Sequence, residues 1–227
     1  MIEPSLQRAA RLTGLATLLS ILVVVSVEFG IKSRLVVAGD AATTARNILA
    51  NETLFRVNVL GDLAYCAGVI LVSCGLFIIL KGVSETLALI AAVFRLVFAL
   101  TWLLATYNLL TSLRFFHGSS YLKAIDANQL QALGRFYLNG YDAYYIGLLF
   151  WSIAAAICGY LFLKSRFIPA WLAIFGALGS IWCAACTAGL IVYPDLPNYV
   201  NLWWFDAPMT LYEIVLGGLL LFRGLRT

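Results

Sequence analysis

Apolar runs of about 20 residues recur along the whole chain, and each could cross the roughly 30 Å hydrocarbon core of a bilayer as a helix. Only helices and closed barrels satisfy the backbone within lipid, and these runs are too long for barrel strands. Of the 227 residues, 63% are hydrophobic and only 11% are charged, against roughly 25% charged in soluble domains. We therefore predict an all-α polytopic membrane protein with a single domain, residues 1–227. The six predicted transmembrane helices cover residues 10–31, 55–80, 85–112, 138–163, 168–192 and 206–223.

The connections between the predicted helices are of two kinds. Residues 81–84 and 164–168 form tight turns, so they join antiparallel helical hairpins. The longer connections must lie on the opposite side, which we expect to be the non-cytoplasmic one. Two of them show helical patterns after Asp40 and Asp126, and aspartate is a favoured N-cap, so we predict a short amphipathic interfacial helix at each place. The second helix would carry Leu130, Leu133, Phe136 and Tyr137 at helical spacing.

Lysine and arginine near helix ends favour the cytoplasmic side of a membrane. The side of the N-terminus carries Arg8, Arg11, Lys81, Lys164, Arg166, Arg223 and Arg226, all near short connections. The other side carries Lys32, Arg34, Arg46, Arg114, Lys123 and Arg135, spread over longer loops. This small bias favours a cell-membrane protein with both termini in the cytoplasm.

One arginine, Arg95, lies about halfway along the apolar segment 87–105. Charged side chains within spans are rare and usually face the interior of the bundle. The apolar segments also contain four carboxylates, which are Glu28, Asp62, Asp142 and Glu213. Because an unpaired buried charge is costly, the surplus acids must be hydrated, protonated or paired with a ligand. We predict a polar pocket open toward the outer leaflet or the outer water, with these four acids as catalytic groups. The predicted substrate-binding residues are Arg95, Tyr65, Trp102, Asn108, Tyr144, Tyr145 and Tyr212.

A structural role for Arg95 is the alternative. An ion pair with one carboxylate would fix the register of two helices without any chemistry. Glu28 and Asp142 lie nearest the outer edge, so headgroup water could hydrate both of them.

Several stretches carry a family resemblance: EFGIKSRLVVAGDAATTARNILANETLFR, VFRLV, YLKAIDANQLQAL, YYIGLLF and GYLFLKSRFIPAWL. They resemble bacterial membrane proteins of the domain-of-unknown-function 4386 family, from the first helix to the fifth. The resemblance implies a compact six-helix membrane protein and brings no established activity. The polar positions that match the family are Glu28, Asp40, Arg56, Asp62 and Arg95.

The fourth predicted helix departs from the family pattern. The family usually has aspartate before its Ile-Gly-Leu, and often a histidine about two turns later. Tyr145 and Ala154 stand at those positions, and Asp142 lies three residues earlier. Chemistry that depends on the family's acid and histidine is therefore in doubt for this chain.

Three functions fit these patterns. The first is a cofactor-independent enzyme in which Asp62 or Glu213 protonates a lipophilic substrate, for example in terpene or prenyl cyclisation or isomerisation. Aromatic faces stabilise cations, which suits such an intermediate. The second is a proton-coupled carrier, since intramembrane acids also mark proton relays; a chain of this length would need a homodimer. The third is a non-catalytic accessory or sensor protein that binds membrane lipid.

Other chemistries find little support. The lone histidine, His117, lies in a predicted loop, and Cys183 and Cys186 lie among small residues that favour helix packing. We therefore expect no metal site and no cofactor. The net charge of +4 is spread over helix ends, so we expect no nucleic-acid partner.

Overall fold

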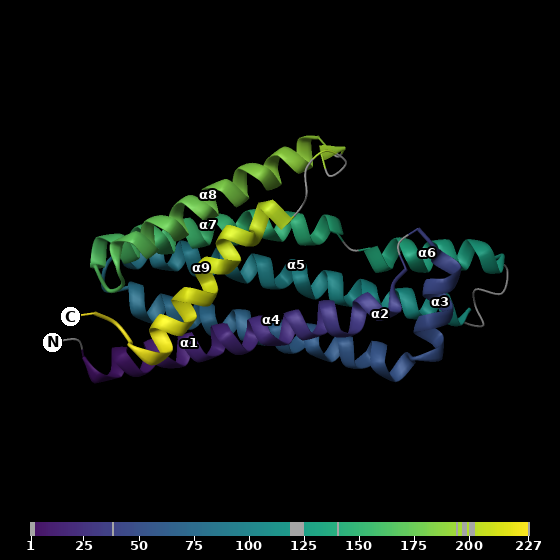
Figure 1. Cartoon of the computed structure of the whole chain (residues 1–227), viewed down its shortest axis with the longest axis horizontal. Coiled ribbons are helices and arrows are strands. Elements are labelled where there is room, and N and C mark those ends of the chain that lie inside the picture. Colours follow the sequence, from purple (N-terminus) through teal and green to yellow (C-terminus); the bar gives the residue numbers. More distant parts are fainter. Residues whose placement is uncertain are drawn as a thin grey trace. The chain divides into compact units, whose positions relative to one another are not determined.

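The computed structural model describes residues 3–37, 39–118, 125–139, 141–193, 195–196, 199 and 203–226. Six helices in this part of the chain are long and apolar enough to cross a membrane, and it contains no strand. The predicted all-α fold with six spans is confirmed (Figure 1). The chain is a multi-pass membrane protein.

The observed helices extend beyond several predicted spans. The first span, Pro4–Leu35, consists of α1 (Pro4–Val25), a π-helical segment η1 (Ser26–Lys32) and α2 (Ser33–Leu35). The other five are α4 (Glu52–Leu80), α5 (Glu85–His117), α7 (Tyr141–Ser165), α8 (Ala170–Val192) and α9 (Trp203–Phe222). Two shorter helices, α3 (Ala41–Ala50) and α6 (Ala127–Asn139), lie in the longer connections.

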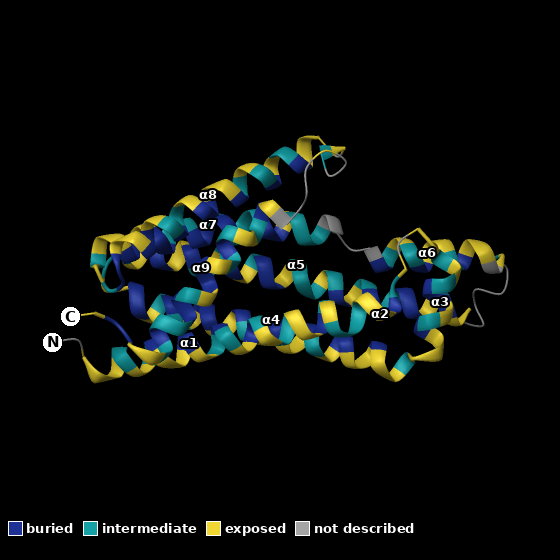
Figure 2. Ribbon diagram, in the orientation of Figure 1, coloured by how far each residue is buried: buried dark blue, intermediate teal, exposed yellow. Residues whose placement is uncertain are grey.

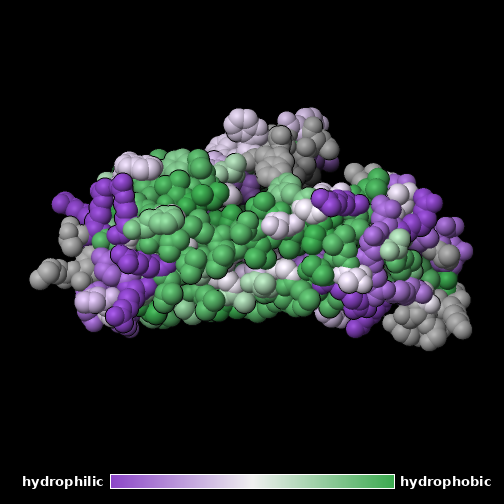
Figure 3. Space-filling view, turned by 60° about the horizontal axis from the view of Figure 1, so that its bottom comes forward, coloured by the Kyte–Doolittle hydropathy of each residue, from purple (hydrophilic) through white to green (hydrophobic). Residues whose placement is uncertain are grey.

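The outward side chains of the long helices are apolar, as lipid contact requires. Leu12, Leu60, Leu71 and Leu100 are each more than 60% exposed. Figure 3 shows hydrophobic surface along the helices, with hydrophilic atoms gathered at the left and at the right of the view. Solvent-facing helices of a soluble protein would carry polar residues at such positions.

Tertiary contacts divide the chain into two compact units. Unit 1 comprises residues 1–21, 67–100 and 145–227, and unit 2 comprises residues 22–66 and 101–144. The helices α1, α4, α5 and α7 contribute residues to both units.

Small residues let the helices of unit 1 approach closely. Gly14 of α1 lies against α9, where an added Cβ would stand 2.5 Å from the Gly217 carbonyl oxygen. Gly176 of α8 lies under the ring of Tyr212, and Tyr212 is completely buried. The Gly176 contact agrees with the close helix packing that the small residues around Cys183 predict.

The Gly176 contact gives a matched pair of stability predictions. A methyl group at Gly176 would overlap the Tyr212 ring, so Gly176→Ala is expected to destabilise the chain by about 1–3 kcal/mol. Gly218 of α9 has no atom within 4 Å of an added Cβ, so Gly218→Ala is expected to be neutral or to stabilise by up to about 1 kcal/mol. Thermal unfolding of both variants in one detergent measures the difference. Equal midpoints would contradict the assignment of Gly176 as a packing contact.

Both termini are tied to the same end of unit 1. The Gln7 side chain donates from Nε2 to the Leu225 carbonyl at 2.8 Å and accepts from the Leu225 amide at 2.9 Å. The Arg226 amide donates to the carbonyl of Phe167, in the turn between α7 and α8, at 2.8 Å. This end therefore joins the start of α1, the end of α9 and a tight turn, as the predicted topology requires (Figure 1).

In unit 2 both predicted connecting helices form, with the predicted caps. The Asp40 carboxylate accepts from the Thr43 amide at 2.8 Å, and Asp126 accepts from the Asn128 amide at 2.9 Å. Hydrogen bonds from the Thr43 hydroxyl and amide hold the pKa of Asp40 below its usual range. Both helices are therefore anchored at their N-termini by their own sequence.

The face of α6 that packs on the protein includes only part of the predicted apolar stripe. Leu130 and Leu138 are buried, and Gly134 between them packs on the ring of Phe116. Leu133 is 38% exposed and Phe136 is 73% exposed. The spacing of four residues places Leu130, Gly134 and Leu138 on one face, and this face packs on α5 because its glycine admits an aromatic ring.

Candidate functional site

The helix α4 has a single buried stripe, and Asp62 belongs to it. Phe55, Asp62, Val69 and Leu76 recur every seven residues and are all buried. Figure 2 shows that buried and exposed positions alternate along the long helices in this way. A seven-residue interval returns to the same side of a helix. Helix geometry therefore directs the Asp62 carboxyl inward, at 3% exposure.

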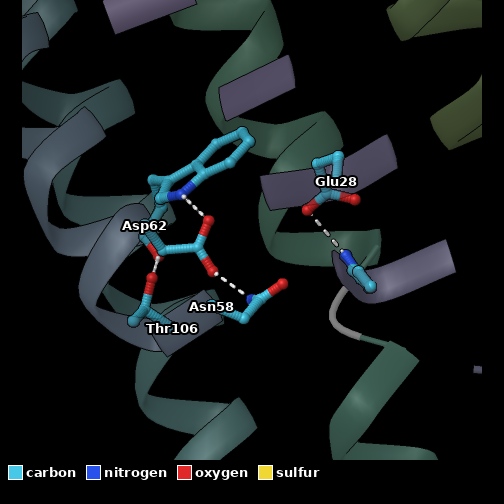
Figure 4. A network of polar contacts seen from close by, with 6 residues as sticks. Glu28, Asn58, Asp62 and Thr106 are labelled. Carbon is cyan, nitrogen blue, oxygen red and sulfur yellow. Dashed lines mark hydrogen bonds and ion pairs between the residues drawn. The ribbon is translucent and has the colours of Figure 1, made fainter. Parts of the chain in front are cut away.

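Two neutral groups hydrogen-bond the Asp62 carboxyl in unit 2 (Figure 4). The Asn58 side chain donates from Nδ2 to Oδ2 at 3.1 Å, and the Trp102 indole donates from Nε1 to Oδ1 at 3.3 Å. Among the described residues, no lysine, arginine or histidine nitrogen lies within 4.0 Å of this carboxyl. Asp62 is thus a buried acid without a counter-ion in the part of the chain that the structure describes.

Asn58 has an unused acceptor beside this acid. It is 1% exposed, and its Oδ1 has no hydrogen-bond partner. An amide carries a donor and an acceptor at nearly equivalent positions. Rotation of the Asn58 amide would therefore replace its donor with its acceptor at the Asp62 oxygen, and the side chain could pair with Asp62 in either protonation state.

Aromatic rings surround the Trp102 indole that contacts Asp62. The ring centroid of Trp102 lies 4.7 Å from that of Tyr65 and 5.7 Å from that of Tyr144, both in edge-to-face geometry. The hydroxyl of Thr106 donates to the Trp102 carbonyl at 2.9 Å. Tyr65 is buried, whereas Trp102 and Tyr144 are half-buried, so the two latter rings extend from the acid toward the surface.

Glu28 lies in the same unit but has its own cation. Its Oε1 stands 2.9 Å from Nζ of Lys32, and both side chains are about one-third exposed (32% and 29%). Figure 4 shows this pair apart from the Asp62 hydrogen bonds. The negative charge of Glu28 is therefore largely neutralised by Lys32, one helical turn away.

The Glu28 pair lies in the π-helical segment η1. A π-turn inserts an extra residue into a helix and often occurs at functional sites. Val27 of this segment packs on Gly61 of α4, where a Cβ would overlap it, and Gly61 directly precedes Asp62. The irregular turn thus contacts α4 next to the buried acid.

Arg95 and Glu213 form a buried ion pair in unit 1. The Arg95 Nη2 and Glu213 Oε1 atoms are 2.7 Å apart, and the two residues are 2% and 4% exposed. The guanidinium carbon also lies 5.8 Å from the centroid of the Trp151 ring. The positive charge of Arg95 is therefore neutralised by the Glu213 carboxylate, which α9 contributes.

Three buried polar atoms near this pair have no hydrogen-bond partner. They are Nε of Arg95, Nε1 of Trp151 and the hydroxyl of Tyr212. All three atoms can donate hydrogen bonds. Unlike Asp62, Glu213 is paired with a cation in the part of the chain that the structure describes.

The other predicted site residues lie at several places on the helices. Asn108 is half-buried on α5, six residues beyond Trp102 and therefore on another face. Tyr145 is half-buried and belongs to unit 1, whereas Tyr144 belongs to unit 2. The side chain of Asp142 lies outside the described residues. No group of three metal-ligating side chains occurs in the described ranges.

The structure contains fewer unpaired acids among the described residues than the sequence predicts. The sequence places Lys32 just beyond the first predicted span, but the first helix extends past it and brings it to Glu28. The four-residue spacing of Glu28 and Lys32 is the signal that could have identified this pair. Of the three carboxylates whose side chains are described, only Asp62 has no cationic partner.

Comparisons with known proteins identify a family for the chain. A family model described as "Domain of unknown function (DUF4386)" matches residues 12–224. No curated protein and no solved structure matches the chain.

Proposed function

Since the chain belongs to the family with the domain of unknown function DUF4386, we propose a function from its own residues: it is a membrane-embedded enzyme. In this proposal Asp62 exchanges a proton with a lipophilic substrate, and the reaction is a cyclisation or isomerisation that requires no cofactor. The observation that carries the proposal is the burial of Asp62 among neutral hydrogen-bond donors. Burying an unpaired charge is costly, so such a carboxyl is suited to hold a proton and to transfer it to a bound substrate.

Asn58 supports proton exchange at Asp62. A general acid must be stabilised both before and after it loses its proton. The Asn58 Nδ2 group donates a hydrogen bond to the carboxylate. After rotation of the amide, the unused Oδ1 would accept a hydrogen bond from the carboxylic acid.

The aromatic rings suit a cationic intermediate. The Asp62 carboxyl gives its proton to an alkene carbon, a C–H bond forms, and the adjacent carbon becomes positive. The next double bond of the substrate attacks that carbon and closes a C–C bond, while the faces of Tyr65, Trp102 and Tyr144 stabilise the charge. Loss of a proton from a neighbouring carbon to the carboxylate forms the product alkene and restores the acid. The substrate is thus isomerised and nothing else is consumed.

Incubation in heavy water tests this reaction. Purified membranes that contain the chain are supplied with an acyclic prenyl alcohol such as geranylgeraniol, and products are separated by gas chromatography with mass detection. We expect a cyclic or isomerised product that carries one non-exchangeable deuterium from the Asp62 carboxyl. Control membranes without the chain should give no such product. Products without deuterium, or no product from any prenyl substrate of this class, would contradict the proposal.

A proton-coupled carrier is the second candidate, and the π-helical segment favours it. Irregular helix turns beside an intramembrane acid are typical of transporter binding sites, and η1 contacts α4 next to Asp62. Proteoliposomes with an imposed pH gradient would distinguish the two candidates. Flux of a lipophilic cation that follows the gradient, without chemical change of the solute, would favour the carrier.

We also propose that both termini face the cytoplasm of a cell in whose plasma membrane the chain lies. Basic residues favour the cytoplasmic side, and the end of unit 1 that joins the termini carries Arg8, Arg11, Arg223 and Arg226. A protease-cleavable tag at the C-terminus should be protected in intact cells and cut after lysis. Cleavage in intact cells would reverse the orientation.

A further inference from the structure

A hollow of about 490 Å³ lies at the end of unit 1 that joins the two termini. It is formed by the start of α1, the end of α4, the following turn, the start of α5 and the turn before α8. Its lining residues are Leu6, Ile78, Ile79, Lys81, Gly82, Val83, Glu85 and Phe167. The site is far along α4 from Asp62 and belongs to unit 1 alone.

The hollow presents two opposite charges that do not neutralise each other. Lys81 and Glu85 stand on either side of the turn between α4 and α5, and both are exposed. No ion pair joins them within the part of the chain that the structure describes. Each charge is therefore available to an outside group of opposite sign.

The rest of the lining is apolar and continues onto the lipid-facing surface. Leu6, Val83 and Phe167 are half-buried in the hollow, and Ile78 is 44% exposed at its edge. Leu89, one turn further along α5, is 52% exposed. A molecule with a charged head and a hydrocarbon chain would match this combination of surfaces.

We propose that this hollow binds the headgroup of an aminophospholipid. Lys81 binds the phosphate, Glu85 binds the primary ammonium, and an acyl chain lies along Ile78. Phosphatidylglycerol has the same phosphate but a neutral glycerol in place of the ammonium, so it would leave the Glu85 carboxylate without an ion-pair partner. The proposal does not depend on the proton chemistry at Asp62.

Native mass spectrometry of the purified full-length chain tests the proposal. The chain in detergent is titrated separately with phosphatidylethanolamine, phosphatidylcholine and phosphatidylglycerol, and retained lipid is counted. We expect phosphatidylethanolamine to bind more tightly than the other two, by up to about fivefold, because exposed ion pairs contribute at most roughly 1 kcal/mol. Glu85→Gln should abolish the preference over phosphatidylcholine, whereas Lys81→Gln should weaken the binding of all three lipids.

Matched variants separate the site from net charge and from folding. Glu3→Gln and Arg11→Gln change the charge as Glu85→Gln and Lys81→Gln do, but neither residue lines the hollow. Both controls should keep the lipid preference, and all four variants should unfold at the same temperature as the parent chain. Equal binding of the three lipids, tighter phosphatidylglycerol binding that ignores Glu85→Gln, or release of lipid by millimolar inorganic phosphate would each overturn the proposal.

Discussion

Replacing Arg95 by methionine is expected to lower the free energy of unfolding by about 3–5 kcal/mol. The substitution leaves Glu213 buried at 4% exposure without its cation. The hydrocarbon around the bundle cannot hydrate the stranded carboxylate, so the cost falls on the folded chain. Glu213→Leu should cost a similar amount, because it strands the guanidinium in the same way. Thermal unfolding in a single mild detergent measures both effects.

The double variant tests whether the contributions of Arg95 and Glu213 to stability are coupled. With both charges removed, Arg95→Met and Glu213→Leu together should recover most of the stability that either single change loses, since apolar replacements of buried ion pairs are often neutral or stabilising. Arg11→Gln on the exposed face of α1 serves as a control and should have little effect. Additive losses in the double variant would contradict a coupled pair.

Asp62→Asn is expected to reduce turnover of the prenyl substrate by about 10²–10⁴-fold, the usual contribution of a positioned general acid. Asparagine keeps the size of the side chain and an acceptor for the Trp102 indole, but it cannot supply a proton. The unfolding temperature should therefore change little while activity is lost. Asp62→Glu, which keeps the acid on a longer arm, should retain part of the activity.

Glu28→Gln is the matched control for Asp62→Asn. It removes one carboxylate from the same unit, but Glu28 is one-third exposed and paired with Lys32. Turnover should stay within a few-fold of the parent chain. If Asp62→Asn left turnover unchanged, or if Glu28→Gln lost as much activity as Asp62→Asn, Asp62 would not be the proton donor.

Much of the fold could be predicted because its signals are local. Runs of apolar residues specify the six spans, and an aspartate before each short helix specifies where α3 and α6 begin. The inward direction of Asp62 was also readable, since Phe55, Val69 and Leu76 repeat at seven-residue intervals around it. These features depend on residues within one or two turns of each other.

The pairing of charges could not be predicted, because it depends on contacts between distant segments. The sequence allows Arg95 to pair with any of several acids, and the choice of Glu213 joins residues 118 positions apart. The Glu28 pair was missed for a different reason. The apolar run ends before Lys32, but the π-helical segment carries the helix past it.

The contacts of α1 have a consequence for the order of assembly. Ser20 and Thr13 of α1 pack on Gly68 and Gly75 of α4, a helix synthesised soon afterwards. The face of α1 at Gly14 packs instead on Gly217 of α9, which is synthesised after the other five spans, and the Gln7 side chain can bond Leu225 only after α9 has been made. Until α9 is made, this face of α1 has no helix packed on it. A chain truncated before α9 should therefore insert into the membrane without these contacts and be recognised by quality-control proteases.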